Sequence, residues 1–175
     1  MGSTKMTADD FHQNLANAYF KVLSSTDWTD PVVVAGLREG LNKFLSNAHL
    51  AFFKGVNKYH KTHWMSQGAL EQLERHDYRD LVWEHLVTKT SYIQGPCERS
   101  ARQGTLTIEF IEELLDKYWH LATITKQENR MLHPLLMPNE WDRENIFARY
   151  ESVGIKLIPN PFFRKLCESR RRPGT

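Results

Sequence analysis

The chain has 175 residues, of which 41% are hydrophobic and 25% charged, with a formal net charge of +2. This length suits one domain with its own core, and the composition excludes a disordered or fibrous chain. Two cysteines, Cys97 and Cys167, are too few for a disulfide framework, and no CxxC pair offers a zinc site. The weak positive charge is not typical of a dedicated nucleic-acid-binding protein.

We expect neither a secretory signal nor a membrane-spanning segment. No apolar run reaches the roughly 18–20 residues needed to cross a bilayer, and the first residues lack the apolar stretch of a secretory signal. We therefore expect an intracellular protein in a reducing compartment. The sequence does not distinguish the cytoplasm from an organelle such as the mitochondrion.

Two helices are predicted in the first third of the chain. Residues 8–23 place apolar side chains on one face, and Thr7 is a suitable N-cap. Asp30-Pro31 is a helix start, with an N-cap residue followed by proline at the first helical position. A stripe at helical spacing then continues to about His63, which predicts one long central helix.

The middle of the chain is predicted to be helical with one loop. Ser66-Gln67-Gly68 interrupts the pattern, and shorter helices are expected at residues 69–75 and 78–90. The segment 94–104 contains Gly-Pro and polar residues and is predicted to be a loop. Residues 107–122 form the clearest amphipathic helix, with acidic residues opposite an apolar face.

The last third begins with a capping box, Thr125-Lys126-Gln127-Glu128, and the helix it opens is expected to end near His133 before Pro134. Three further segments follow in the prediction: a helix from Pro138 to a C-cap at Gly154, a short extended piece at 155–158, and a final helix at 162–171.

These elements predict an all-α fold. We expect an irregular bundle of about six to eight helices around the long central one. The expected boundaries are a single domain over residues 1–175, with short extended arms at 1–7 and 159–175.

The segment Arg79-Asp80-Leu81-Val82-Trp83-Glu84-His85 resembles the motif of HEPN ribonucleases, in which an arginine precedes a polar residue and, a few positions later, a histidine. The resemblance covers seven residues. It implies that Arg79 and His85 from two paired protomers act together on an RNA phosphate. The chemistry is sensible, because arginine binds phosphate and histidine transfers protons near neutral pH. A packed histidine is the structural alternative.

His60 and His63 have a spacing compatible with shared metal ligation. A metal site would need a third ligand from another segment. The interpretation we favour is a hydrated basic helix end formed with Lys58 and Lys61, and we expect no metal and no cofactor.

The C-terminal segment combines aromatic and basic residues. Phe162, Phe163 and Arg164 follow a proline turn, and Arg170-Arg171-Arg172 lies near the end. Such an arm is suited to contact a partner protein, although the two phenylalanines would equally suit the chain's own core. We predict these six residues as partner-binding.

No nucleotide-binding loop or nucleophile motif is present. We therefore expect a non-catalytic accessory or structural subunit that binds protein subunits of a larger assembly. The first alternative is the HEPN-like ribonuclease with Arg79 and His85. The second is a helical nucleic-acid-associated protein that uses Lys58, Lys61 and the C-terminal arginines.

Overall fold

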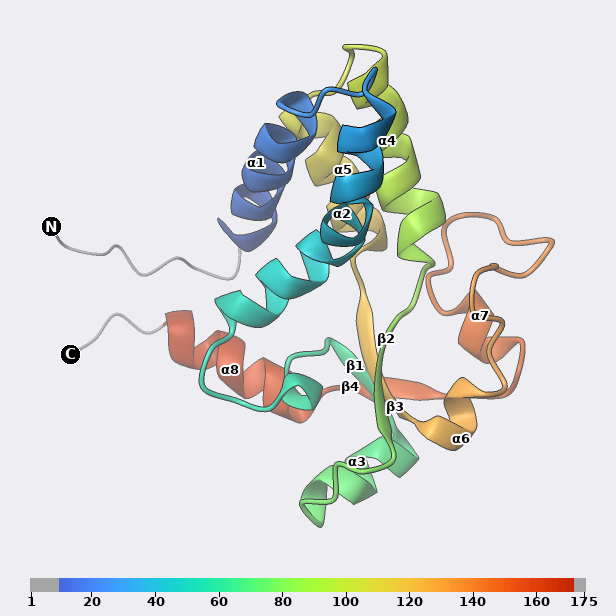
Figure 1. Ribbon diagram of the computed structural model, residues 1–175. Coiled ribbons are helices and arrows are strands. Elements are labelled where there is room, and N and C mark those ends of the chain that lie inside the picture. The colour runs from blue at the N-terminus through green and yellow to red at the C-terminus, as the bar shows by residue number, and fades with distance from the viewer. Residues whose placement is uncertain (1–9, 172–175) are drawn as a thin grey trace, which may run out of the picture.

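The computed structural model describes residues 10–171 (Figure 1). Over this range the chain forms eight α-helices and a four-stranded mixed sheet, with 56% of residues helical and 10% in strands. The all-α prediction is therefore wrong. The protein has a mixed α and β fold, because four short segments pair with one another across long stretches of sequence.

The α-helices are α1 Asp10–Ser24, α2 Pro31–Phe52, α3 Gln67–Glu74, α4 Gly95–Arg102, α5 Ile108–Tyr118, α6 Lys126–Asn129, α7 Ala148–Glu151 and α8 Pro161–Arg171. The strands are β1 Trp64–Ser66, β2 Leu81–His85, β3 Leu121–Thr125 and β4 Leu157–Pro159. A 3₁₀ turn, η1, covers Lys58–His60, and a single π-helical turn, η2, covers Thr90–Gln94.

The strand order is β2-β3-β1-β4. The two central strands, β3 and β1, are parallel, with Trp64 opposite Ala122, and both outer strands are antiparallel to their neighbours. Residues 121–124 of β3 are all buried, as expected for the central strand of a sheet covered on both faces.

Strand β2 lies where a helix was predicted. Leu81 and Val82 fit an apolar helical face as well as they fit a strand, so a short apolar run of this kind does not decide between the two. Pairing decides it: all five residues of β2 match residues of β3, from Leu81 opposite Thr125 to His85 opposite Leu121. The helix predicted to run to residue 122 ends at Tyr118, and the β-branched residues that follow form β3.

Helices α1, α4, α5 and the first part of α2 gather at one end of the molecule, and α2 runs from there toward the sheet (Figure 1). Leu15, Tyr19, Leu45, Ile111 and Leu115 are buried in the core between them. The predicted helices at 8–23 and 107–122 are thus confirmed in their existence and in their inward faces. Thr7, the expected cap of the first helix, lies outside the described residues.

Helix α2 ends at Phe52, well before the predicted end at His63. Apolar spacing continues beyond Phe52, but Gly55 adopts φ +84°, which a continuous right-handed helix does not contain. The chain then passes through η1 and enters β1. The predicted long helix is therefore present, but its last part is replaced by a turn that leads into the sheet.

The start of α2 is confirmed. The Asp30 carboxylate accepts hydrogen bonds from the backbone N–H groups of Val32 (2.7 Å) and Val33 (3.2 Å), and Pro31 occupies the first turn. Replacing Asp30 by Ala should lower the free energy of unfolding by about 1 kcal/mol, because two donors lose their acceptor. Asp30→Asn, which keeps a capping oxygen, is the control and should stay close to wild type in urea unfolding followed by circular dichroism.

The predicted loop at 94–104 is largely helical. Pro96 lies in the first turn of α4, and the π-helical turn η2 leads into α4 without a break. The final helix predicted at 162–171 is present as α8, and Asn160 caps it by accepting hydrogen bonds from the N–H groups of Phe162 (3.0 Å) and Phe163 (3.3 Å). The arm expected to be extended at 159–175 is therefore helical over most of its described residues. The predicted arm at 1–7 lies outside the described residues.

The capping box at Thr125 is confirmed, although its helix, α6, already ends at Asn129. Glu128 accepts hydrogen bonds from the Thr125 N–H (2.8 Å) and also from the Ser66 hydroxyl (2.7 Å), so one carboxylate joins the ends of β3 and β1. The helix predicted from Pro138 to Gly154 is reduced to the single turn α7. In residues 10–171, no helix combines the length and the hydropathy needed to cross a membrane.

Candidate functional site

Most of the polar residues around one cavity come from the end of β2 and the start of η2. The cavity has a volume of about 390 Å³, and we call it the His85 cavity. One wall is polar and the opposite wall is an apolar loop; the lining residues are Glu84, His85, Thr88, Lys89, Thr90, Ser91, Pro134, Leu135 and Leu136.

Arg149 of α7 joins the end of β2 to the loop at His133 by hydrogen bonds. Its side chain is 3% exposed and donates to the Glu84 carboxylate (2.8 Å), to the backbone carbonyl of His133 (3.1 Å) and to the backbone carbonyl of His85. A buried guanidinium needs such partners, because an unpaired charge in the interior is strongly unfavourable. Arg149 therefore fixes the loop at His133 against the end of β2.

His85 is held in its neutral form. Burial, followed by the positive charges of Lys89 and Arg149, lowers its pKa to about 3. The imidazole lies edge-on to Trp83 (5.0 Å between ring centroids) and to Trp119 (5.1 Å). Its Nε2 atom is shielded from solvent and has no hydrogen-bond partner. Nε2 is thus a buried polar atom whose hydrogen-bonding capacity is not used by the chain.

Two neighbours of His85 add donors. Thr88 is 7% exposed, and its hydroxyl is buried without a partner. Lys89 donates from Nζ to the backbone carbonyl of Asn42, and burial lowers its pKa. A buried polar group without a partner costs about 1–3 kcal/mol and requires an explanation. Lys89 is the partly exposed donor among the residues that line the cavity.

The cavity also lies at the start of a helix. η2 begins at Thr90 with no side-chain cap, and it continues into α4 as far as Arg102. The first amide groups of a helix carry partial positive charge and favour anions. Single π-helical turns are frequent at functional sites. These features agree with the cationic neighbours, so the chemistry of this wall fits an anion.

The structure does not bring Arg79 and His85 together within one chain. Arg79 precedes β2, its side chain is 86% exposed, and it forms an ion pair with Asp77 (2.8 Å). His85 is the last residue of β2, about 20 Å away at the usual rise of an extended strand. The expected helix that would have carried both residues is a strand, so this geometry gives the ribonuclease hypothesis no support.

His60 and His63 do not form a metal site. The ring of His60 stacks on Phe162 (4.5 Å between centroids), whereas Nδ1 of His63 accepts the backbone N–H of Leu121 (3.1 Å). Burial lowers the pKa of both imidazoles. Among the described residues, no three His, Cys, Asp or Glu side chains are arranged to hold a metal ion.

The predicted C-terminal binding residues are largely occupied within the chain. Phe162 packs on His60, and Phe163 packs on His63 (4.8 Å) and Phe53 (5.1 Å). Arg164 is exposed and pairs with Glu168. The side chains of Arg170 and Arg171, and the whole of Arg172, lie outside the described residues.

The basic residues named for the nucleic-acid alternative behave differently from each other. Lys58 is exposed and lies over the ring of Tyr59 (4.9 Å from its centroid). Lys61 is 7% exposed, and its Nζ donates to the backbone carbonyl of Leu50 (2.9 Å). Only Lys58 of this pair is available to a phosphate.

Sequence reasoning identified His85 but missed Glu84, Thr88, Lys89 and Arg149. Three of them follow one another closely in the run Glu84-His85-x-x-Thr88-Lys89, and this density of polar groups after an apolar strand was a signal available in the sequence. Arg149 lies far away in the sequence and is brought to the site only by folding. Searches of known protein families, of curated proteins and of solved structures find no match to this chain.

Proposed function

We propose that this chain is a non-catalytic interaction protein that binds an acidic segment of a partner protein at the His85 cavity. The segment would carry a carboxylate or phosphate group beside apolar side chains. The observation that carries this proposal is that a partly exposed cationic donor, Lys89, adjoins an exposed apolar loop.

Charge supports the anionic part of the proposal. Lys89 and Arg149 contribute two positive charges and Glu84 one negative charge, which leaves the site with one net positive charge. The ammonium of Lys89, a partly exposed residue of the cavity lining, is able to donate to an oxyanion. A histidine with a pKa of about 3 is too weak a base to take a proton near neutral pH, so binding is favoured over proton transfer.

Exposed apolar side chains support the partner-protein part. Met131, Leu135 and Leu136 are 51%, 65% and 57% exposed, and they account for three of the five large hydrophobic residues so exposed in the described chain. We call these three residues the apolar rim. Two of them line the His85 cavity itself. Adjacent exposed apolar residues mark interaction surfaces when they surround a polar pocket.

The apolar rim is held in place before any partner binds. Nδ1 of His133 accepts the backbone N–H groups of Leu135 (3.2 Å) and Leu136 (3.1 Å), and Arg149 fixes the carbonyl of the same histidine. A preformed surface loses little conformational freedom on binding.

The proposal predicts a defined peptide preference. The purified chain should be screened against a synthetic peptide library in which Asp, Glu or phosphoserine is placed beside varied residues. We expect enrichment of an acidic position next to Leu, Ile or Phe. Lys89→Gln should weaken the selected peptides about tenfold or more, because a charged hydrogen bond is lost. Leu135→Ser combined with Leu136→Ser should weaken them by a similar factor.

The matched control variants remove a lysine or an apolar side chain outside the His85 cavity. Lys156→Gln removes an exposed lysine, and Val32→Ser removes an exposed apolar residue that is 77% exposed on α2. Both variants should bind the selected peptides as the wild type does. The proposal fails if the library shows no acidic preference, or if inorganic phosphate binds at the cavity but no peptide does, which would indicate a small phosphorylated ligand instead.

A further inference from the structure

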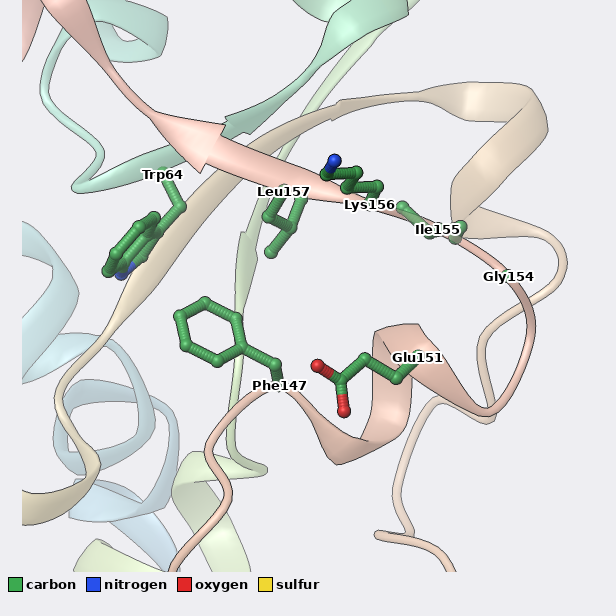
Figure 2. Close-up of a pocket in the computed structure, with 7 residues that line it drawn as sticks. All are labelled: Trp64, Phe147, Glu151, Gly154, Ile155, Lys156 and Leu157. Atoms are coloured by element: carbon green, nitrogen blue, oxygen red, sulfur yellow. The ribbon is translucent and has the colours of Figure 1, made fainter.

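A second cavity lies near β4, the edge strand opposite β2 in the sheet, between β1, β4 and α7. It has a volume of about 520 Å³, within the range of small-molecule sites. Trp64, Phe147, Ile155 and Leu157 supply apolar walls, and Gly154, Lys156 and Glu151 complete the lining (Figure 2). We call it the Trp64 cavity. It shares no lining residue with the His85 cavity.

Two aromatic rings form one corner of the Trp64 cavity. Trp64 and Phe147 meet edge to face, with 4.8 Å between ring centroids and an interplanar angle of 88°. The indole Nε1 of Trp64 is shielded from solvent and has no hydrogen-bond partner. The faces of aromatic rings attract cations.

One carboxylate is directed at this aromatic corner. Figure 2 shows the Glu151 carboxylate turned toward the space between Phe147 and β4, and the Lys156 ammonium on the opposite side of the strand. Asn145 donates to Oε2 of Glu151 (2.7 Å), which fixes the carboxylate. Within residues 10–168, Glu151 takes part in no ion pair. The negative charge is therefore not neutralised by the chain.

We propose that the Trp64 cavity binds a small organic cation, an ammonium compound with an apolar body. The ammonium lies between the Glu151 carboxylate and the rings of Trp64 and Phe147. Aromatic walls favour a weakly hydrated ammonium over a metal ion, and the carboxylate excludes anions. This proposal is independent of the function proposed for the His85 cavity.

The test compares choline with 3,3-dimethyl-1-butanol, a neutral molecule of the same shape and hydroxyl group. Binding to the full chain is followed by the indole N–H resonance of Trp64 in proton–nitrogen NMR spectra, assigned by its loss in Trp64→Phe. We expect choline to shift this resonance with a dissociation constant in about the millimolar range, as suits so small a ligand. The neutral alcohol should bind at least about fivefold more weakly.

Three variants separate the contributions. Glu151→Gln, at an exposed position that should not disturb folding, should weaken choline about fivefold to tenfold and leave the alcohol unchanged. Phe147→Leu should reduce the preference for choline over the alcohol. Glu113→Gln, which removes an exposed carboxylate on α5 away from this cavity, is the matched control and should bind choline as wild type does. Equal binding of choline and the alcohol, no binding of either, or full choline binding by Glu151→Gln would each overturn the proposal.

Discussion

Acidification from about pH 7 to about pH 4 should unfold the chain steeply, because several histidines are buried in the neutral form. Burial, with smaller opposing and reinforcing effects, lowers the pKa of His49 to about 4 and that of His85 to about 3. Burial and the neighbouring His49 hold the pKa of His63 well below its usual value. In the unfolded chain these imidazoles take up protons near pH 6.5, roughly their ordinary pKa.

The sign of the effect follows from proton uptake. Between about pH 6.5 and pH 4 the unfolded chain binds protons that the folded chain does not, so stability falls as the pH falls through this window. One pKa unit corresponds to about 1.36 kcal/mol, so His49 alone removes about 3 kcal/mol by pH 4. Net stabilities of domains are about 5–15 kcal/mol, so the loss from several such histidines should exceed the whole stability.

His49 shows why the neutral form is required. Its Nε2 donates to the backbone carbonyl of Lys61 (2.7 Å), and its Nδ1 accepts the indole N–H of Trp119 (3.2 Å). Only the neutral tautomer with hydrogen on Nε2 satisfies both partners. Protonation at Nδ1 would place two N–H groups against each other in a site that is fully buried.

Urea unfolding at a series of pH values checks the prediction. His49→Gln removes the titrating group, so its stability should depend on pH with a shallower slope, by up to about 1.4 kcal/mol per pH unit, even if the variant is less stable at neutral pH. Val32→Ser, at an exposed position without a titrating group, is the control, and its slope should equal that of wild type. An unchanged slope in His49→Gln would contradict the assignment.

The sequence predicted the helices that are long and contiguous and missed the strands. In α1 and α5 the apolar spacing repeats over several turns, so the signal lies within one segment. β1 has three residues and pairs with residues at 122 and 158, and no local pattern reveals such distant partners. The early end of α2 at Phe52 depends on Gly55, a single residue within an otherwise continuous stripe.

The candidate sites also combine residues that the sequence identified with contacts that depend on the folded structure. The sequence pointed to His85 because histidine and arginine can act together on a phosphate. The expected pairing of His85 with Arg79 assumed a helix, whereas residues 81–85 form a strand and Arg79 pairs with Asp77. Burial could not be predicted for this site. Nε2 of His85 and the hydroxyl of Thr88 lose their contact with water, and find no hydrogen-bond partner, only when the chain folds. Phe162 and Phe163 were recognised as anchors, yet the choice between a partner and the chain's own core is decided by where α8 packs.

Removing one member of the Glu84–Arg149 pair should destabilise the fold by about 3–5 kcal/mol, because the pair is buried. Arg149 is 3% exposed and Glu84 26% exposed, and the distance between them is 2.8 Å. Glu84→Gln leaves the guanidinium inside with only carbonyl partners. Arg149→Met also frees the carbonyls of His133 and His85, so it should be the more damaging of the two changes.

A double-mutant cycle in urea unfolding measures the coupling. The variant with both Glu84→Gln and Arg149→Met should be more stable than the sum of the two single changes predicts, because no unpaired charge remains. The exposed Arg79–Asp77 pair is the control, and Asp77→Asn should have no measurable effect on unfolding. Additive losses in the cycle would mean that the two side chains do not stabilise each other.

The same substitutions connect stability to binding. Arg149 positions His133, and His133 positions the backbone of Leu135 and Leu136, so Arg149→Met should disturb the apolar rim even under conditions where the variant remains folded. Peptides selected by the wild type should therefore bind Arg149→Met more weakly, whereas binding of choline at the Trp64 cavity should persist. If peptide binding by the folded variant stays at the wild-type level, Arg149 supports the fold alone and the rim does not depend on it.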